Sequence, residues 1–203
     1  MTQYQQTIQD ADEPTHMADE KQDGSSFTTG QAVTRAGNST AIRGVCGLLY
    51  DSVAIPAGST IDSAFLQVGS AGSVGDILVD IHANDVDDAA NFSVEADATS
   101  RARTTASVTF NYTNIPQTMD DSPDIKTVIQ EVVDRAGWSS ENSICLLLVG
   151  RNNGTSLFAQ IDNDLGGNTN PRLTINFTEP TAAGGGGSGG PQLQGVFDMQ
   201  GMI

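Results

Sequence analysis

The chain of 203 residues is short of basic side chains: nine Lys and Arg stand against 25 Asp and Glu, which gives a formal net charge of −16. Only Lys21 and Lys126 are lysines. Such an acidic surface repels phosphate backbones, so we do not expect nucleic acid as a partner. Acidic, lysine-poor surfaces suit saline surroundings or a multivalent cation, but they also occur in ordinary soluble proteins.

Long apolar runs are missing too. No segment is long or apolar enough to span a bilayer, so we expect no membrane partner. The first 20 residues have neither the basic region nor the apolar region of a secretory signal. The expectation is therefore a protein made in a host cytoplasm and released by assembly or lysis.

Motifs of catalysis are absent as well. The only histidines are His16 and His82, and neither lies near a cysteine, a serine elbow or a metal-spaced partner in the sequence. No G-x-S-x-G, HExxH or P-loop pattern occurs. Acidic residues are plentiful, but the sequence singles out no pair for glycoside hydrolysis. We predict that the protein is not an enzyme.

Aromatic residues make up only 5% of the chain, and Trp138 is the single tryptophan. A carbohydrate platform usually presents two or more exposed aromatic faces, so sugar binding is the weaker prediction. Trp138 follows Gly137, where it can cover the end of a helix and the core. We interpret it as a structural residue.

The two cysteines, Cys46 and Cys145, both lie in apolar, strand-like runs. Two cysteines in a chain of this length do not make a disulfide scaffold. We interpret them as buried free thiols, and the alternative is one bridge between strands. The basic pair Arg101 and Arg103 also leaves two readings open, because these arginines either pair with Glu95 and Asp97 or contact an acidic neighbouring subunit.

Alternation of apolar and polar residues predicts strands along most of the chain. In residues 76–82, Ile77, Val79 and Ile81 fall on one face, as in a half-buried strand. Further strands are expected at 42–50, 64–68, 107–112, 155–161 and 172–177, with a central strand at the continuously apolar 144–149 and a first strand at 4–8. Many short strands separated by turn signals predict an all-β fold, an antiparallel β-sandwich.

One segment has helical periodicity instead. Its apolar residues fall at i, i+3, i+4, i+7 and i+8, namely Ile125, Val128, Ile129, Val132 and Val133. Ser122 can cap the start with Pro123 in the first turn, and Gly137 can close the end. This pattern predicts one amphipathic helix of about three turns, packed on a sheet.

The far end of the sequence has a different composition. Residues 184–190 are six glycines and one serine, which is typical of a flexible spacer, although the same run also resembles an engineered linker. Apolar side chains follow in residues 191–203: Leu193, Val196, Phe197, Met199, Met202 and Ile203. Burying five such side chains is worth roughly 7–15 kcal/mol before the cost of ordering them. We predict a body at 1–178 whose first 40 residues are of uncertain order, a linker at 179–190 and a docking peptide at 191–203.

Several motifs resemble the DNRLRE-type β-sandwich domains. The run from Val53 to Leu66, VAIPAGSTIDSAFL, is similar to their strand–turn–strand motif, and matches follow in order at 85–92, 100–108, 129–138 and the closing strand that ends at Phe177. The resemblance covers roughly residues 40 to 177, although the literal DNRLRE signature is absent. It implies a jelly-roll-like, non-catalytic scaffold or binding module of the kind found in bacterial surface proteins and tailed-virus structural proteins.

Two acidic loops suggest a metal site. Asp85, Asp87 and Asp88 crowd one loop, while Asp162, Asp164 and Asn168 crowd another before the last strand. Clustered carboxylates supply the oxygen ligands that Ca²⁺ or Mg²⁺ prefers. The alternatives are solvated loop charge or a structural Ca²⁺, with the loop around Asp162 preferred for the ion.

Taken together, these features predict a non-enzymatic virion structural protein of a tailed virus. Its partners would be other capsid or tail subunits, including copies of itself in a homo-oligomer. The specific prediction is a capsid decoration, or cement, protein anchored by its C-terminal arm. The alternatives are a tail or fibre-attachment component, or a carbohydrate-binding or adhesion module that contacts a host glycan.

Overall fold

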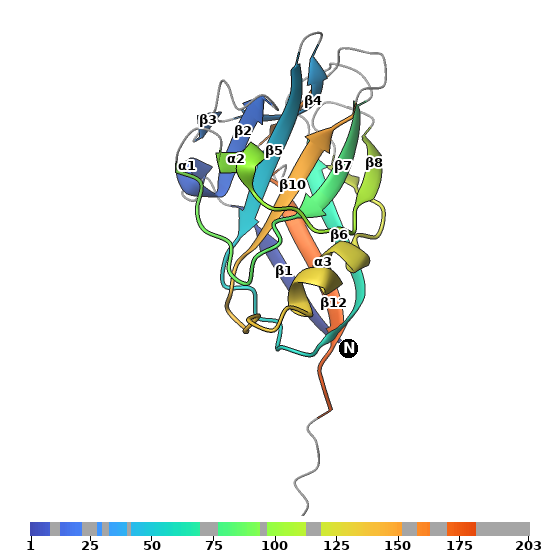
Figure 1. The fold of residues 1–203 in the computed structure, drawn as a ribbon. Helices are drawn as coiled ribbons and strands as arrows, with labels where there is room; N and C mark the ends of the chain where they lie inside the picture. Colours follow the sequence, from blue (N-terminus) through green and yellow to red (C-terminus); the bar gives the residue numbers. More distant parts are fainter. Residues whose placement is uncertain are drawn as a thin grey trace, which may run out of the picture.

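A computed structural model of the chain describes residues 1–8, 13–21, 28–29, 33–39, 42–69, 77–93, 97–112, 119–151, 158–162 and 170–181. Its strands form two antiparallel sheets that face each other (Figure 1). The all-β antiparallel sandwich predicted from the alternation is therefore confirmed. Among the described residues, no helix has the length and apolar character needed to cross a membrane.

The smaller sheet, sheet A, has four strands. In spatial order these are β1 (Thr2–Thr7), β12 (Arg172–Thr178), β6 (Thr60–Gly69) and β9 (Met119–Asp121). Residues near the two ends of the body therefore pair with each other, since β1 lies antiparallel to β12 with Thr2 opposite Phe177.

The larger sheet, sheet B, has eight strands. Six of them follow in the order β11 (Phe158–Asp162), β4 (Val33–Ser39), β5 (Ile42–Tyr50), β10 (Ile144–Gly150), β7 (Ile77–Ala83) and β8 (Val108–Tyr112). The other two are β2 (Met17–Lys21), which pairs with β5, and β3 (Thr28–Thr29), which pairs with β2. The first 40 residues thus contribute β2, β3 and β4 as well as β1, where the sequence predicted one strand and a long loop.

The central strand of sheet B is β10. It pairs with β5 on one side and with β7 on the other, and all its residues from Ile144 to Gly150 are buried. A strand covered on both faces reads as a continuous apolar run, which explains why the sequence ICLLLVG does not alternate. The predicted central strand is confirmed.

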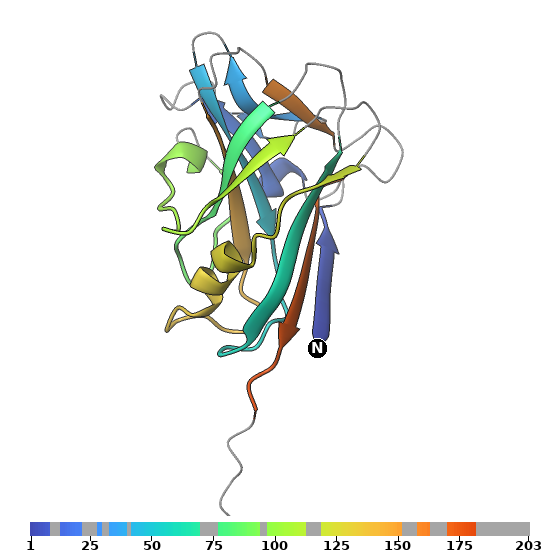
Figure 2. The same cartoon turned by 90° about the vertical axis from the view of Figure 1, so that its right-hand side faces the viewer.

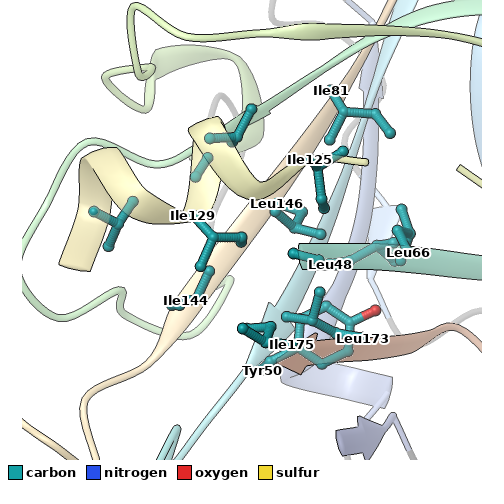
Figure 3. Close-up of a cluster of buried hydrophobic side chains, with 14 of the residues drawn as sticks. Leu48, Tyr50, Leu66, Ile81, Ile125, Ile129, Ile144, Leu146, Leu173 and Ile175 are labelled. Atoms are coloured by element: carbon teal, nitrogen blue, oxygen red, sulfur yellow. The ribbon is translucent and has the colours of Figure 1, made fainter. Parts of the chain in front are cut away.

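Side chains from the facing sides of the two sheets form the main core. Figure 3 shows Leu48, Tyr50, Ile81 and Leu146 from sheet B and Leu66, Leu173 and Ile175 from sheet A pointing into this layer, with Ile125 and Ile129 beside them. Each fully buried Leu or Ile contributes roughly 1.5–3 kcal/mol relative to its exposed state. The sandwich is held together mainly by this apolar layer.

A second apolar cluster covers the outer face of sheet B. Phe92 lies over Gly47 of β5, and Ala98 of the one-turn helix α2 (Asp97–Ser100) packs into the same cluster. Because alternate residues of a strand point to opposite faces, Cys46 lies in the main core and Cys145 lies in this outer cluster. Both cysteines are buried and free, as the preferred interpretation predicted.

The predicted helix is α3 (Lys126–Val133), and it closes the open side of the sandwich between β6 and β7 (Figure 2). Its buried residues are the predicted ones, Val128, Ile129, Val132 and Val133, with Ile125 just before its start. The helix is shorter than predicted because Ser122 continues the pairing with sheet A: its N–H donates to the Leu66 carbonyl at 2.8 Å. Ser122 therefore does not cap the helix, and Asp124 accepts the Lys126 N–H at 3.0 Å in its place.

The far end of α3 also differs from the prediction. The helix ends at Val133 with Asp134 as its C-cap, so Gly137 lies beyond the turn that it was expected to close. A further one-turn helix, α1 (Glu13–His16), was not predicted.

The close approach of Phe92 to β5 makes a testable prediction about Gly47. A Cβ atom on residue 47 would lie 2.2 Å from Cζ of Phe92, a ring that is 1% exposed and has no room to withdraw. We expect Gly47→Ala to lower the free energy of unfolding by about 1–3 kcal/mol. In a Phe92→Leu background the same change should cost clearly less, as measured by urea unfolding of all four proteins. Additive effects would contradict the packing described.

Candidate functional site

The chain leaves the sandwich at one end, which we call the tether pole and define by Thr2, Gly58, Asp62 and residues 178–181. There the Thr178 hydroxyl donates to Asp62 Oδ2 at 2.9 Å, and the Thr2 hydroxyl donates to Glu179 Oε1 at 3.3 Å. Residues 178–181 are exposed and point away from the body, beside the N-terminus (Figures 1 and 2). The predicted linker therefore begins at the surface of the sandwich.

The predicted docking residues lie outside the described residues. These are Leu193, Val196, Phe197, Met199, Met202 and Ile203. Their role stays a prediction, as does the division of the chain into body, linker and docking peptide.

Strand β1 forms one edge of sheet A, directly beside the tether pole. The Ile8 N–H donates to the Pro171 carbonyl at 3.1 Å, in the pair that follows Thr7 and Arg172. Since hydrogen-bonded and non-hydrogen-bonded pairs alternate in an antiparallel ladder, the backbone groups of Gln3 and Gln5 face away from β12. In the part of the chain that the structure describes, no strand pairs with that outer side.

A polar network fastens β1 to the end of β5. The Gln6 side chain donates to Asp51 Oδ1 at 2.7 Å, and His16 Nε2 lies 3.4 Å from Asp51 Oδ2. The Tyr4 hydroxyl donates to Gln6 Oε1. The hydrogen bond from Gln6 and the contact with His16 lower the pKa of Asp51, whereas burial and the negative charges of Asp51 and Glu141 raise the pKa of Tyr4.

The outer face of sheet A is polar and nearly uncharged along its middle. Gln3 donates to Asn176 Oδ1 at 3.1 Å, and Asn176 donates to the Ser63 hydroxyl at 2.9 Å, so that one row of side chains crosses three strands. Phe65 projects from β6 on this face and is 37% exposed. Sequence reasoning did not single out this face, although the polar positions of β1 and β12 were a usable signal.

The acidic loop at 85–88 is fastened by an arginine. Arg135 Nε donates to Asp87 Oδ1 at 2.7 Å and its Nη1 donates to Asp85, and these contacts raise the pKa of Arg135. Asp88 Oδ1 accepts the Ser143 N–H at 2.8 Å. A Cβ on Gly137 would lie 2.1 Å from Asp87 Oδ2, so this glycine is needed for the close approach.

These contacts correct the metal prediction for the 85–88 loop. The cation shared by Asp85 and Asp87 is the guanidinium group of Arg135, and within the described residues no three His, Cys, Asp or Glu side chains are grouped to hold a metal. For the other loop, Asp162 is the last residue of β11, while Asp164 and Asn168 lie outside the described residues. Calcium at that loop stays a prediction.

Three residues that the sequence left between a site and a structural role have structural contacts. Trp138 is 3% exposed and donates to the Ile55 carbonyl at 3.0 Å, which confirms its structural interpretation. Arg101 pairs with Asp97 at 3.2 Å and stacks on Phe92, with its guanidinium carbon 4.0 Å from the ring centroid. His82 Nδ1 lies 3.1 Å from the Thr104 carbonyl.

Comparisons with known proteins do not supply a family. No family matches the sequence, and no curated protein matches it. Among solved structures, a family 11 carbohydrate-binding module from Clostridium thermocellum, in complex with a β-1,3-1,4-mixed-linked tetrasaccharide, aligns with 85% of this chain and 86% of that chain. The identity is 12% and the TM-score is 0.22, which is too low to carry an argument about this chain.

The network around Asp51 predicts a pH dependence. Because the pKa of Asp51 is lowered on folding, its charge stabilises the protein above its ordinary value of 3.8, and this stabilisation disappears as the pH falls through the folded pKa. We expect Gln6→Ala to lower the free energy of unfolding by about 1 kcal/mol near neutral pH. The loss should shrink below a pH of about 4, where Asp51 is protonated in both states. Denaturant unfolding at several pH values measures this.

Gln3→Ala is the matched control for that series. Gln3 lies on the same strand but bonds to Asn176 on the outer face. Its loss of stability should not vary with pH. The network would be refuted as a source of acid sensitivity if the two variants had the same pH profile.

Proposed function

We propose that this chain is a non-enzymatic structural protein of a virion, in which the sandwich is a passive body and residues 191–203 fasten it to a neighbouring subunit. The observation that carries the proposal is the exit of the chain at the tether pole, where residues 178–181 are exposed and lead into the Gly/Ser run. A docking peptide is effective only if its tether begins at the surface. The DNRLRE-type resemblance belongs to this proposal and supports it.

The surroundings of the sandwich support a passive body. The space between the sheets is filled with apolar side chains, and the outer face of sheet B is covered by the cluster around Phe92. The 85–88 loop and Arg101 are engaged in ion pairs within the chain. The particular role that we propose is capsid decoration, with attachment to a tail as the alternative.

Spacer length fits such an anchor. The linker from residue 179 to residue 190 spans up to about 40 Å when extended, so the peptide can reach an adjacent subunit. On a particle with many copies, repeated weak docking gives a high overall avidity.

A particle-binding assay tests the proposal. Full-length protein and the full-length variant Phe197→Asp are added to particles from which the protein has been stripped. We expect the aspartate, which cannot be buried without a large cost, to weaken binding at least about tenfold, or 1.4 kcal/mol. The control is Gln200→Ser, a polar replacement in the same peptide. Equal binding of all three proteins would contradict an anchoring arm.

The polar outer face of sheet A favours a second candidate function, recognition of a neutral host glycan. Amide and hydroxyl side chains there surround the exposed ring of Phe65, and such groups form the hydrogen bonds and stacking contacts that sugars require. On a panel of neutral polysaccharides, Phe65→Ala should then abolish retention while Phe197→Asp leaves it unchanged. No retention of the wild-type chain on any polysaccharide would remove this candidate.

A further inference from the structure

We infer that the receptor for the arm is the outer edge of β1 in a neighbouring copy of this chain, where residues 191–203 add to sheet A as a further strand. This inference rests on the proposed function and adds to it the identity of the partner. An extended peptide that joins a sheet edge gains affinity from main-chain hydrogen bonds and specificity from alternate side chains.

The first argument is the chemistry of the edge. The outward backbone groups of Gln3 and Gln5 form a short template for pairing, and strand edges of this kind are normally guarded by lysine, proline or inward charges. The sequence of β1, TQYQQT, contains none of these. The opposite edge of sheet A, β9, is only three residues long and carries Asp120 and Asp121.

The second argument is the pattern of the arm. Odd-numbered positions from 193 to 203 carry only apolar residues or glycine, in the order Leu193, Gly195, Phe197, Met199, Gly201 and Ile203. Most even-numbered positions from 192 to 200 are polar, with Val196 as the exception. A period of two is typical of a strand with one buried face and is not that of a helix.

Charge is the third argument. The chain has a net charge of −16, so most of its surface repels another copy. The edge strand β1 has no ionisable group other than Tyr4, and Asp198 is the only charged side chain in residues 191–203. The arm can therefore approach β1 with less repulsion than most of the surface would impose.

The length of the linker indicates a neighbouring copy rather than the same chain. Thr2 lies opposite Phe177 in the ladder, so the exit of the arm is already beside the start of β1. Pairing within one chain would need a connection of only a few residues, whereas 12 residues separate Thr178 from Pro191. Because exit and receptor are adjacent on each copy, two copies can exchange arms across one symmetric interface.

Self-association of the full chain tests the inference. Sedimentation over a wide range of concentrations is measured for the wild type, for Phe197→Asp and for the double variant Gln3→Pro/Gln5→Pro. Proline removes the outward N–H groups of β1 but no donor that faces β12. The matched control, Gln3→Thr/Gln5→Thr, loses the same side chains and keeps both N–H groups.

We expect the aspartate and the proline variants to associate at least about tenfold more weakly than the wild type, and the threonine control to associate normally. If Phe197→Asp weakens association and the proline pair does not, the arm docks elsewhere: the inference falls and the anchoring function stands. A wild type that stays monomeric at every concentration overturns the inference, while the particle-binding assay still decides the proposed function.

Cross-linking keeps the inference testable if the proline variant does not fold. A Gln5→Cys chain is mixed with a Met199→Cys chain under mild oxidation, and the native Cys46 and Cys145 do not interfere because they are buried. We expect a disulfide dimer that contains one chain of each kind. Asn111→Cys, an exposed position on the edge strand β8, is the control. Equal dimer yields from the two edges would overturn the assignment to β1.

Discussion

The pairing of β5 with β10 is the contact on which the rest of the structure depends. Six consecutive residue pairs join these strands, from Ile144 opposite Tyr50 to Val149 opposite Val45. Because successive side chains point to opposite faces, this one ladder supplies apolar residues to the main core and to the outer cluster at once. A shift of its register by one residue would exchange the two sets and disrupt both layers.

Two filled layers leave the periphery of the body as its functional part. Ion pairs and hydrogen bonds that involve Arg135, Arg101 and Trp138 fasten the loops and the helix end to the sandwich. What remains open in the described part of the chain is the tether pole, the outer edge of β1 and the polar face of sheet A. These features lie together because β1 pairs with β12, from which the chain leaves. Their proximity is the physical basis of the assembly role that we propose.

The sequence predicts well those elements whose period is set by burial. Strands β5, β7, β10 and β12 and the buried face of α3 follow directly from apolar spacing. It fails for β2 to β4, where polar residues such as Asp19 and Glu20 lie in a strand held by its neighbour β5. The salt bridge from Arg135 to Asp85 joins residues 50 apart, so the acidic loop alone suggested a metal instead. The edge of β1 is also a property of the assembled sheet and not of any local pattern.

Hydrogen exchange tests most directly whether association is carried by the edge of β1 while the body stays unchanged. Amide exchange is compared between the wild type at an associating concentration and the Phe197→Asp variant at the same concentration. The account predicts that the amides of Gln3 and Gln5 gain protection only in the wild type, and that those of β5 and β10 are protected equally in both. Protection gained on another strand, or on none, would contradict it.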